Sequence, residues 1–569
     1  MRGLATGGAV LGVLPATGSV FGQQTTQHGT APALSGTEFN LEIAETPVNF
    51  TGMPQMATSI NGSIPGPTLY WREGDTVTIR VTNRLRESTS IHWHGMILPY
   101  QMDGVPGISF PGIAPGETFT YRFTVKQHGT YWYHSHSGFQ EMTGVYGAIV
   151  IAPRAGEIHQ VDRDYPVLLS DWTDDDPMEV FRKLKNMGDY YNLNRPSFQS
   201  FYQDVSRMGL TSALEKRQMW NQMRMNPTDL SDLSAGTLTF LMNGQTPNGN
   251  WSGIFQPGER VRLRFINGTG NTFYDVRIPG CKLQVIQSDG INIHPVSVDE
   301  FRFGPGETYD VIIEPEDEAC TIFAQSMERT GYASGTLTSR AGLTAPVPAV
   351  DPPQWLSMTD MMGAMSTGMM AGAGHAMPMD HSQHGASATM PMPASAPVVR
   401  HASSEYGAST DMLVNTPRTN LDDPGIGLRD NGRRVLTLAD MHALDEFTDR
   451  REPGRDIELH LTGNMERYTW SVDGLEFGQS TPIHFRFGER LRVILHNDTM
   501  MTHPMHLHGV WSELESPTGE LLTRKHTLAV QPAQRISFQV TADALGRWAW
   551  HCHLLFHMDA GMFREVLIA

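Results

Sequence analysis

The sequence predicts an all-β protein built from three β-sandwich domains. After Thr37, short runs in which polar and apolar residues alternate are separated by Gly, Pro and Asn. A period of two is typical of strands with one buried face, and many such strands joined by turns are typical of sandwiches. The clearest runs are 76–82, 118–124, 261–265, 310–314 and 490–495.

A weak internal repeat favours three domains of common origin. A turn containing Gly and an acidic residue precedes an alternating strand at three places, and these strands end at Asn83, Asn267 and Asn497. The spacing is far longer than a solenoid unit, and 569 residues suffice for three domains.

Changes in composition divide the chain further. Residues from about 174 to 232 are rich in Lys, Arg, Met, Asn and Tyr at helical spacing, which predicts a mostly helical insert. Residues 341–410 are rich in Pro, Ala, Gly, Ser and Met, which predicts a linker with little fixed structure. The predicted segments are 1–36 as export signal and flexible N-terminus, 37–155 as first domain, 156–340 as second domain with its insert, 341–410 as linker, and 411–569 as third domain.

An apolar run without charge occupies residues 4–21, and Arg2 precedes it. The run is Gly-rich and contains Pro15, which disfavours a membrane-spanning helix and stable membrane insertion. A signal-peptide hydrophobic region fits better. The run resembles the later part of a truncated twin-arginine export signal, so we expect a periplasmic mature protein.

The overall composition excludes some classes and favours another. Lys and Arg total 42 while Asp and Glu total 60, and the net charge of −18 argues against a nucleic-acid partner. Three Cys are too few for a disulfide scaffold, a zinc ribbon or a typical iron–sulfur site. The 32 Met and 23 His are instead side chains that suit copper.

Four short motifs concentrate histidines near the two ends of the chain. In a strand, residues i and i+2 point to the same face, so each His-x-His pair presents two imidazoles side by side. One such pair is more often an ordinary pair of polar residues, but four pairs indicate a metal centre. The motifs are His92-Trp-His94, His134-Ser-His136, His503-Pro-Met-His506-Leu-His508, and His551-Cys-His553 followed by His557 and Met562.

The last motif is the most specific. Cys552, His557 and Met562, with one His from 503–508, provide the ligands of a blue-copper centre, in which His, His and Cys are trigonal and a thioether binds weakly. His551 and His553 point to the opposite face of the strand, where they can hold other ions. A short covalent path would carry electrons from the blue copper to those ions.

In this order the motifs resemble those of multicopper oxidases, the family of laccase, ascorbate oxidase and cuprous oxidases. The chain is most similar to the bacterial copper-resistance protein A subfamily, and the likeness covers nearly everything after the signal region. It implies cupredoxin-like Greek-key sandwiches and four copper ions: one type 1, one type 2 and two type 3. Further matching phrases lie at 171–173, 222–229, 424–432, 461–468, 497–501 and 524–526.

The resemblance implies a role for each of twelve metal ligands. The trinuclear cluster, formed by the type 2 and type 3 ions, would lie between the first and third sandwiches. The implied ligands are His503, Cys552, His557 and Met562 for type 1; His92 and His506 for type 2; and His94, His134, His136, His508, His551 and His553 for type 3.

The implied reaction passes single electrons from a reductant to the type 1 copper and reduces O₂ to water at the cluster. A Met axial ligand favours a moderate oxidant, suited to Cu(I) or to easily oxidised organic molecules. Asp103 matches a family acid near the cluster, with a role in proton supply; alternatively, it is a residue of an Asp-Gly turn. Many relatives carry a second acid directly after the second type 1 His, where this chain has Met558.

A Met- and His-rich stretch lies in the predicted linker, and Met377-Pro-Met-Asp-His381 resembles repeats of copper-resistance proteins. Because thioethers can surround Cu(I), we interpret the stretch as a collector of extra Cu(I) that delivers it to the type 1 site. The alternative is a disordered linker whose Met content is incidental. The capture residues would be Met358, Met361, Met362, Met365, Met369, Met370, Met377, Met379, His381, His384, Met390 and Met392.

The other sulfur residues are given no ligand role. The three Met of 219–225 are interpreted mainly as helix packing, and those near the type 1 ligands as its apolar shell. Cys281 and Cys320 form a disulfide or remain two buried thiols, and both readings stay open. The shell residues are Met500, Met501, Met505 and Met558.

The function favoured by these observations is periplasmic oxidation of Cu(I) to Cu(II) by O₂ in copper resistance. The alternatives are a laccase-like oxidase of phenols and a protein that mainly sequesters copper. Sequestration does not require a Cys flanked by cluster ligands. The expected partners are Cu(I) or a small organic reductant, O₂, and other periplasmic copper-handling proteins.

Overall fold

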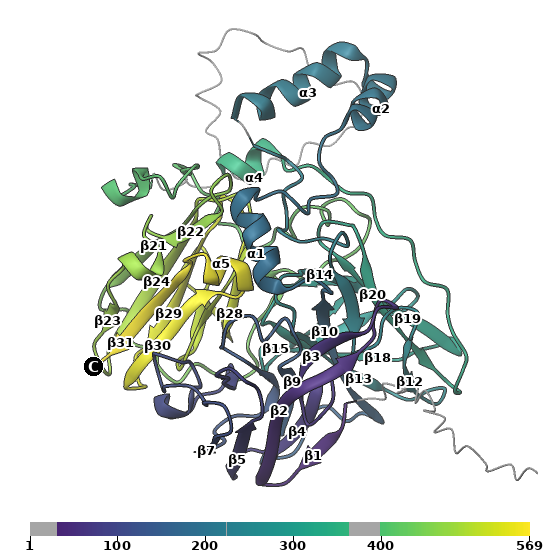
Figure 1. Cartoon of the computed structure of the whole chain (residues 1–569), viewed down its shortest axis with the longest axis vertical. Coiled ribbons are helices and arrows are strands. Elements are labelled where there is room, and N and C mark those ends of the chain that lie inside the picture. Colours follow the sequence, from purple (N-terminus) through teal and green to yellow (C-terminus); the bar gives the residue numbers. More distant parts are fainter. Residues whose placement is uncertain (1–30, 224, 364–398) are drawn as a thin grey trace, which may run out of the picture.

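The computed structural model describes residues 31–223, 225–363 and 399–569. It is mostly β, with six mixed sheets and few helices. Figure 1 shows the purple N-terminal strands at the bottom of the view, the yellow C-terminal strands on the left and the teal middle strands on the right. This architecture confirms the all-β prediction and fits three cupredoxin domains, whose boundaries remain predictions.

Two sheets form the first region, with strand orders β1-β4-β9-β8-β6 and β3-β2-β5-β7. β6 lies at the edge of its sheet, so one side of this short strand is free to meet another part of the chain. The strands are β1 Ala33–Ser35, β2 Glu38–Val48, β3 Gln55–Ile60, β4 Gly66–Arg72, β5 Thr76–Asn83, β6 His92–His94, β7 Thr118–Thr124, β8 Gly129–His134 and β9 Tyr146–Ala152.

The second region has sheets ordered β11-β10-β13-β18-β15-β16 and β12-β20-β19-β14-β17. The strand predicted at 310–314 ends at Ile313, one residue short, because Pro315 has no N–H to continue the ladder. The strands are β10 Arg163–Trp172, β11 Thr239–Met242, β12 Trp251–Ile254, β13 Val261–Asn267, β14 Tyr274–Arg277, β15 Leu283–Ser288, β16 Ile291–Val298, β17 Glu300–Phe303, β18 Thr308–Ile313, β19 Ala319–Ser326 and β20 Tyr332–Thr338.

The third region repeats this plan, with sheets ordered β22-β21-β24-β29-β26-β27 and β23-β31-β30-β25-β28. β25 and β30 therefore hold the places that β14 and β19 hold in the second region. The strands are β21 Asp456–Asn464, β22 Thr469–Val472, β23 Ile483–Phe485, β24 Arg490–Asn497, β25 His503–Leu507, β26 Ser512–Glu515, β27 Leu521–Lys525, β28 Thr527–Val530, β29 Arg535–Thr541, β30 Gly546–Cys552 and β31 Phe563–Ile568.

The three repeated asparagines have one structural role. Each is buried, and its side-chain amide donates hydrogen bonds to two carbonyl groups of neighbouring loops. In the third region, Asn497 bonds the carbonyls of Met501 and Val530 at 2.7 and 2.9 Å. Because buried polar groups require partners, this brace fixes the loop that leads into His503.

The predicted helical insert contains three helices, α1 Pro177–Asn186, α2 Phe198–Met208 and α3 Leu210–Met223. The side chain of Asp176 caps α1, and Pro177 occupies its first turn, where a missing N–H is tolerated. α1 also contacts the third region, since Lys185 Nζ donates to the Tyr468 carbonyl at 2.8 Å. Figure 1 shows α2 and α3 projecting from the β body at the top of the view.

The described ends of the predicted linker, 341–363 and 399–410, contain two short helical elements, while the linker itself remains a prediction. A short helix, α4 Met358–Met362, begins at the capping residue Ser357. Met361 is buried in the hydrophobic core, where its apolar side chain gains from packing, and its role in Cu(I) capture stays a prediction. Met365 to Met392, with His381 and His384, lie outside the described residues.

One continuous hydrophobic core runs through the second and third regions, while the first region has its own core. A smaller apolar cluster, including Trp132 and Trp172, joins the first region to the second. These cores hold the three sandwiches in a fixed arrangement. Within the described part of the chain, none of the helices has both the length and the apolarity to cross a membrane.

The remaining short helices lie in loops. α5 Leu555–Asp559 follows β30 directly and carries His557. Short 3-10 turns are η1 Tyr100–Met102, η3 Ser403–Tyr406, η4 Leu438–Asp440 and η5 Phe477–Gln479.

Candidate metal centres

The histidine strands of the first and third regions face each other. The rings of His92 and His508 stack with centroids 4.1 Å apart, and those of His94 and His506 stack with centroids 3.8 Å apart. All four side chains are buried. The predicted cluster ligands from opposite ends of the chain are therefore brought together at one boundary.

The other predicted cluster ligands join the same group. His553 packs near both His94 and His134, with ring centroids 4.8 and 5.1 Å away. Donor atoms of several histidine triplets lie within 4.8 Å of one another, close enough to share a metal ion. These triplets include His92, His94 and His134; His92, His506 and His508; and His136, His508 and His551.

Buried ring nitrogens without a hydrogen-bond partner test whether copper fits here. Leaving such a nitrogen unpaired costs about 1–3 kcal/mol, so a concentration of them indicates ligands that bind a metal ion. Neutral imidazole suits copper, and the donor set therefore fits. Among the predicted cluster ligands, all of which the structure describes, the unpartnered nitrogens are Nε2 of His92, His134, His136 and His506, Nδ1 of His94, and both nitrogens of His553.

Hydrogen bonds on the opposite ring nitrogens orient these imidazoles. Nδ1 of His92 donates to the carbonyl of Asp103 at 2.8 Å, and Nδ1 of His506 donates to the carbonyl of His526 at 2.7 Å. His94 is turned the other way, because its Nε2 bonds Thr527 Oγ1 at 3.1 Å and its Nδ1 faces the cluster. Such outer partners fix the tautomer that a metal needs.

The carboxylate of Asp103 is buried beside the cluster. Its Oδ2 accepts a hydrogen bond from His508 Nδ1 at 2.9 Å, and its Oδ1 lies 3.3 Å from His92 Nδ1. Asp103 also belongs to a tight turn, since Gly104 has φ +84° and a Cβ there would lie 1.8 Å from the carbonyl oxygen of Ile91. Asp103 is therefore a turn residue whose carboxylate lies beside the candidate cluster, and its role in proton supply stays a prediction.

A second buried carboxylate, which the sequence analysis missed, lies on the other side of the cluster. Glu141 Oε2 is 2.7 Å from His134 Nδ1, and Glu141 Oε1 is 4.0 Å from His553 Nδ1. Burial raises the pKa of Glu141 well above its ordinary value. In the sequence Glu141 lies seven residues after His134, and this closeness to a histidine motif is the only feature that could have indicated its role.

Met558, where relatives have an acid, lines an opening to the cluster instead. A cavity of about 430 Å³ is bordered by Met558, Val105 and Phe563 and reaches His136. His136 is half-buried, whereas the other cluster histidines are buried. This cavity therefore reaches the edge of the candidate cluster at His136.

The second region supplies no predicted ligand but closes the cluster. A Cβ on Gly306 would lie 2.9 Å from the His553 ring and 3.1 Å from the His94 ring, so only glycine fits there. Asp289 Oδ2 accepts hydrogen bonds from the backbone N–H groups of both His526 and Thr527. The middle sandwich thereby positions the outer partners of two cluster histidines.

The predicted type 1 ligands also meet in one buried place. Cys552 Sγ lies 3.5 Å from His503 Nδ1 and 3.8 Å from His557 Nδ1, and the two nitrogens are 3.1 Å apart. The three donor atoms thus face a common point. Met562 is fully buried, and its backbone N–H bonds the His557 carbonyl at 3.0 Å, which keeps it beside the group.

Two side chains lie at the outer nitrogens of this site, and a third stacks on one of its rings. Thr499 Oγ1 lies 2.6 Å from His503 Nε2, in the loop that Asn497 braces. Asp232, from the second region, has its Oδ2 2.9 Å from His557 Nε2. The Trp470 ring stacks on His557 with centroids 3.8 Å apart. The role of Asp232 could not be predicted from sequence patterns, because its partner His557 lies 325 positions along the chain in another sandwich.

Electrostatics keep these imidazoles neutral and ready to bind metal. Burial lowers the pKa of most cluster histidines well below the usual value, and neighbouring imidazoles lower it further; for His551 the value is about 3. Burial likewise raises the pKa of the Cys552 thiol. The histidines with strongly lowered pKa are His94, His134, His136, His503, His506, His508 and His553.

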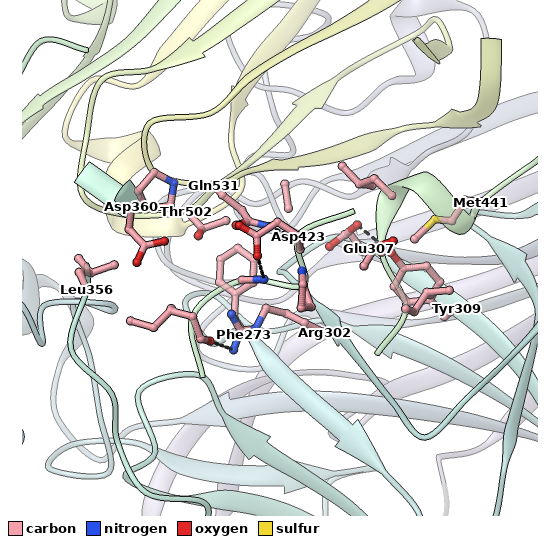
Figure 2. A pocket seen from close by; sticks show the side chains of 18 residues that line it. Phe273, Arg302, Glu307, Tyr309, Leu356, Asp360, Asp423, Met441, Thr502 and Gln531 are labelled. Atoms are coloured by element: carbon pink, nitrogen blue, oxygen red, sulfur yellow. Dashed lines mark hydrogen bonds between the residues drawn. The ribbon is translucent and has the colours of Figure 1, made fainter. Parts of the chain in front are cut away.

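A separate small cavity lies where the second and third regions meet, close to His503. Figure 2 shows Thr502 and Gln531 on one side of it and Phe273 and Arg302 on the other. Its volume of about 70 Å³ holds a few water molecules and excludes an organic reductant.

Cys281 and Cys320 are free thiols in this structure. Each is close enough to hydrogen-bond the other, and Cys320 is the more buried. Neither lies among the candidate metal ligands.

Comparisons with known proteins agree with this geometry. Three family models described as multicopper oxidase match residues 42–156, 163–342 and 450–569. The copper resistance protein A homolog of Pseudomonas syringae pathovar tomato is 56% identical over 95% of this chain and 94% of its own length. Copper resistance protein A of Escherichia coli is 54% identical over 95% of this chain and 93% of its own.

Solved structures show the same fold at lower identity. The laccase of Botrytis aclada has a TM-score of 0.63 and 20% identity, covering 95% of this chain and 89% of its own. A multicopper oxidase of Pseudomonas thermotolerans has a TM-score of 0.59 and 19% identity, covering 94% of this chain and all of its own.

The chain belongs to the multicopper oxidase family and is an O₂-reducing oxidoreductase. Bound copper supplies one-electron redox chemistry; the protein holds the ligands, limits solvent access and places acids beside the imidazoles. His551, Cys552 and His553 are consecutive, so the two metal centres are joined by a few covalent bonds.

The buried neutral histidines predict acid sensitivity of the copper-free chain. The pKa of a histidine is about 6.5 in the unfolded chain and lower in the folded chain. The unfolded chain therefore binds more protons below pH 6.5, and the free energy of unfolding decreases as the pH is lowered. Replacing His553 with Gln removes one such group, so the fall between pH 7.5 and 5.5 should shrink by about 1.4 kcal/mol.

Urea unfolding of the copper-free wild type and variant at both pH values measures this difference. The exposed His484→Gln variant is the control and should leave the fall nearly unchanged. If the free energy of unfolding decreased as much in the His553 variant as in the wild type, His553 would not be a neutral buried imidazole.

Asp103 should act through the imidazoles that it contacts. Asp103→Asn keeps the size of the side chain but removes the charge facing His508 and His92, so O₂ uptake should fall about 10- to 100-fold. The blue absorption of the type 1 site should persist, because Asp103 lies on the cluster side. Asp422→Asn, at an exposed position, is the control. Wild-type uptake in Asp103→Asn would leave Asp103 as a turn residue only.

Proposed function

We propose that this chain is a periplasmic enzyme of copper resistance that oxidises Cu(I) to Cu(II) at the type 1 site. Four Cu(I) ions would give four electrons to O₂, which with four protons yields two water molecules. The names of its curated relatives, at 51–56% identity, support a role in copper resistance. The export-like N-terminal run supports the periplasmic location.

A cavity rich in methionine carries the proposal for the substrate. It has a volume of about 350 Å³ and lies between the helical insert and the third region. Thioethers and carboxylates together suit a copper ion as it changes from the soft Cu(I) to the harder Cu(II). The lining includes Met187, Met225, Met465 and Met500 together with Asp189, Asp229, Asp411 and Glu466.

The cavity connects to the type 1 ligands through two short routes. Asp229 lines the cavity. Burial raises the pKa of Asp229, and the negative charge of Asp232, three residues on, raises it further. Asp232 in turn contacts His557. Met500, on the cavity wall, is next to Thr499, which bonds His503. An electron from a metal ion in the cavity would thus enter at either imidazole.

The remaining residues complete this account. Four copper ions would be held by the twelve implied ligands. The Met- and His-rich stretch would collect Cu(I) and deliver it to the type 1 site; Met361, near its start, is packed in the core. Met225, assigned to packing from the sequence, would instead face the substrate cavity.

The test compares two reductants. We expect O₂ uptake by the copper-loaded chain with Cu(I), and loss of uptake with both Cu(I) and a phenol in Cys552→Ser. If the wild type consumes no O₂ with Cu(I) yet does so with the phenol, the laccase-like alternative replaces the proposal. Copper binding without any uptake would favour sequestration.

Thioethers of the cavity should matter for Cu(I) alone. Met225→Leu with Met465→Leu keeps apolar volume but removes two soft ligands, so Cu(I) oxidation should fall about tenfold, equivalent to about 1.4 kcal/mol. Phenol oxidation should change less than twofold. Met56→Leu, at an exposed position, is the control. Equal losses with both reductants would overturn the assignment of the cavity.

A further inference from the structure

A second group of histidines and carboxylates lies on the sheet of β21 and β24, outside both centres described above. These strands run parallel, and His460 is the register partner of His496. Glu458 is two residues before His460, so its side chain is on the same face. Leu459 and Leu461 alternate with these residues and face the hydrophobic core. The register therefore gathers two imidazoles and a carboxylate on the outer face.

The three side chains approach one another closely. Glu458 Oε1 is 2.8 Å from His496 Nε2 and 3.6 Å from His460 Nε2. The two rings are stacked, with centroids 4.7 Å apart and planes 17° apart. Both imidazoles are more than nine-tenths buried. Within the described residues, His460 Nε2 and both nitrogens of His496 form no hydrogen bond of good geometry, although His496 Nε2 lies within reach of Glu458 Oε1.

Carboxylates behind His460 fix its tautomer. His460 Nδ1 donates to Asp498 Oδ2 at 2.7 Å, which directs Nε2 toward Glu458. His401 adds a third imidazole to the group, with its ring 5.1 Å from that of His460 and its Nδ1 bonded to Glu405 Oε2 at 2.8 Å. A carboxylate–histidine pair that presents a free Nε2 is the arrangement found around metal ions in proteins.

The charges in the group also favour a cation. Burial is the largest single effect and lowers the pKa of His460, but the hydrogen bond to Asp498 and the charges of Asp498, Glu405 and Asp473 together raise it overall. Burial, with the charges of His460 and Arg535, lowers the pKa of His496 to about 3, so this imidazole is neutral. Three carboxylates, Glu405, Glu458 and Asp498, thus surround imidazoles that a metal ion can bind once it displaces a proton.

We propose that His460, His496 and Glu458 form a further metal site that binds a divalent first-row ion, with Cu(II) as the ion bound most strongly. Two imidazoles and one carboxylate suit such ions, and their affinities rise toward Cu(II). Asp498 and Glu405 position the imidazoles. Glu458 is half-exposed, so an ion can enter from solvent.

The location connects this site to the rest of the protein. His401 lies just after the stretch of 364–398, and Asp498 directly precedes Thr499, the partner of the type 1 ligand His503. An ion here would be held close to the type 1 centre without sharing any of its ligands. The site does not depend on whether Cu(I) is the substrate.

The experiment adds Cu(II) to the oxidised chain already loaded with its catalytic copper. We expect one further equivalent of copper per chain after dialysis, and an electron paramagnetic resonance signal split by two nitrogen nuclei. His496→Phe retains the stacked ring but removes both nitrogens, and Glu458→Gln removes the carboxylate. Each variant should weaken binding of the further ion at least about tenfold.

Two controls keep the test decisive. His484→Gln, at an exposed position on β23 of the same region, should bind the further ion like the wild type. Retained blue absorption shows that a variant is folded. If His496→Phe does not fold, Glu458→Gln, at a half-exposed position, tests the proposal instead. The absence of a further equivalent in the wild type, or equal binding by Glu458→Gln and the wild type, would overturn the proposal.

Discussion

The alternation of side chains along β30 is the constraint on which both metal centres depend. Successive residues of a strand point to opposite faces, so Cys552 faces one centre while His551 and His553 face the other. The register with β25 places Met505 opposite Cys552 and His506 opposite His551. A slip of one residue would exchange the two faces and destroy both centres at once. One strand therefore sets the distance between the two candidate metal centres.

The second requirement is that two sandwiches face each other, because three predicted cluster ligands lie on the edge strand β6 and on β8, and a fourth, His136, lies just after β8. The middle region maintains this contact through buried charge as well as apolar packing. Lys525 Nζ lies 3.1 Å from both Asp289 Oδ2 and Glu307 Oε1, and these charges raise its pKa despite burial. Breaking such a buried network would leave uncompensated charges, so the arrangement is cooperative.

The sequence was sufficient for the fold class and for the residues that gather in the two centres, because strand period and ligand chemistry are local patterns. It was insufficient for residues whose roles arise only from packing between distant segments. Glu141 and Asp232 are ordinary acids in the sequence, and only the folded chain places them beside His134 and His557. The order around Met361 was missed for a similar reason: a Met-rich composition does not show which methionine meets the core.

The middle sandwich has the same asparagine brace at Asn267 but carries no predicted copper ligand. On β14, in the place of the ligand-bearing β25, Asp275 is paired with Arg302 and Arg329 at 2.6 Å each. The same domain carries the helical insert and contacts both candidate centres, through Asp232 beside His557 and through Gly306 beside His94 and His553. Residues of this domain away from Asp232, Asp289 and Gly306 can therefore vary without moving a predicted copper ligand.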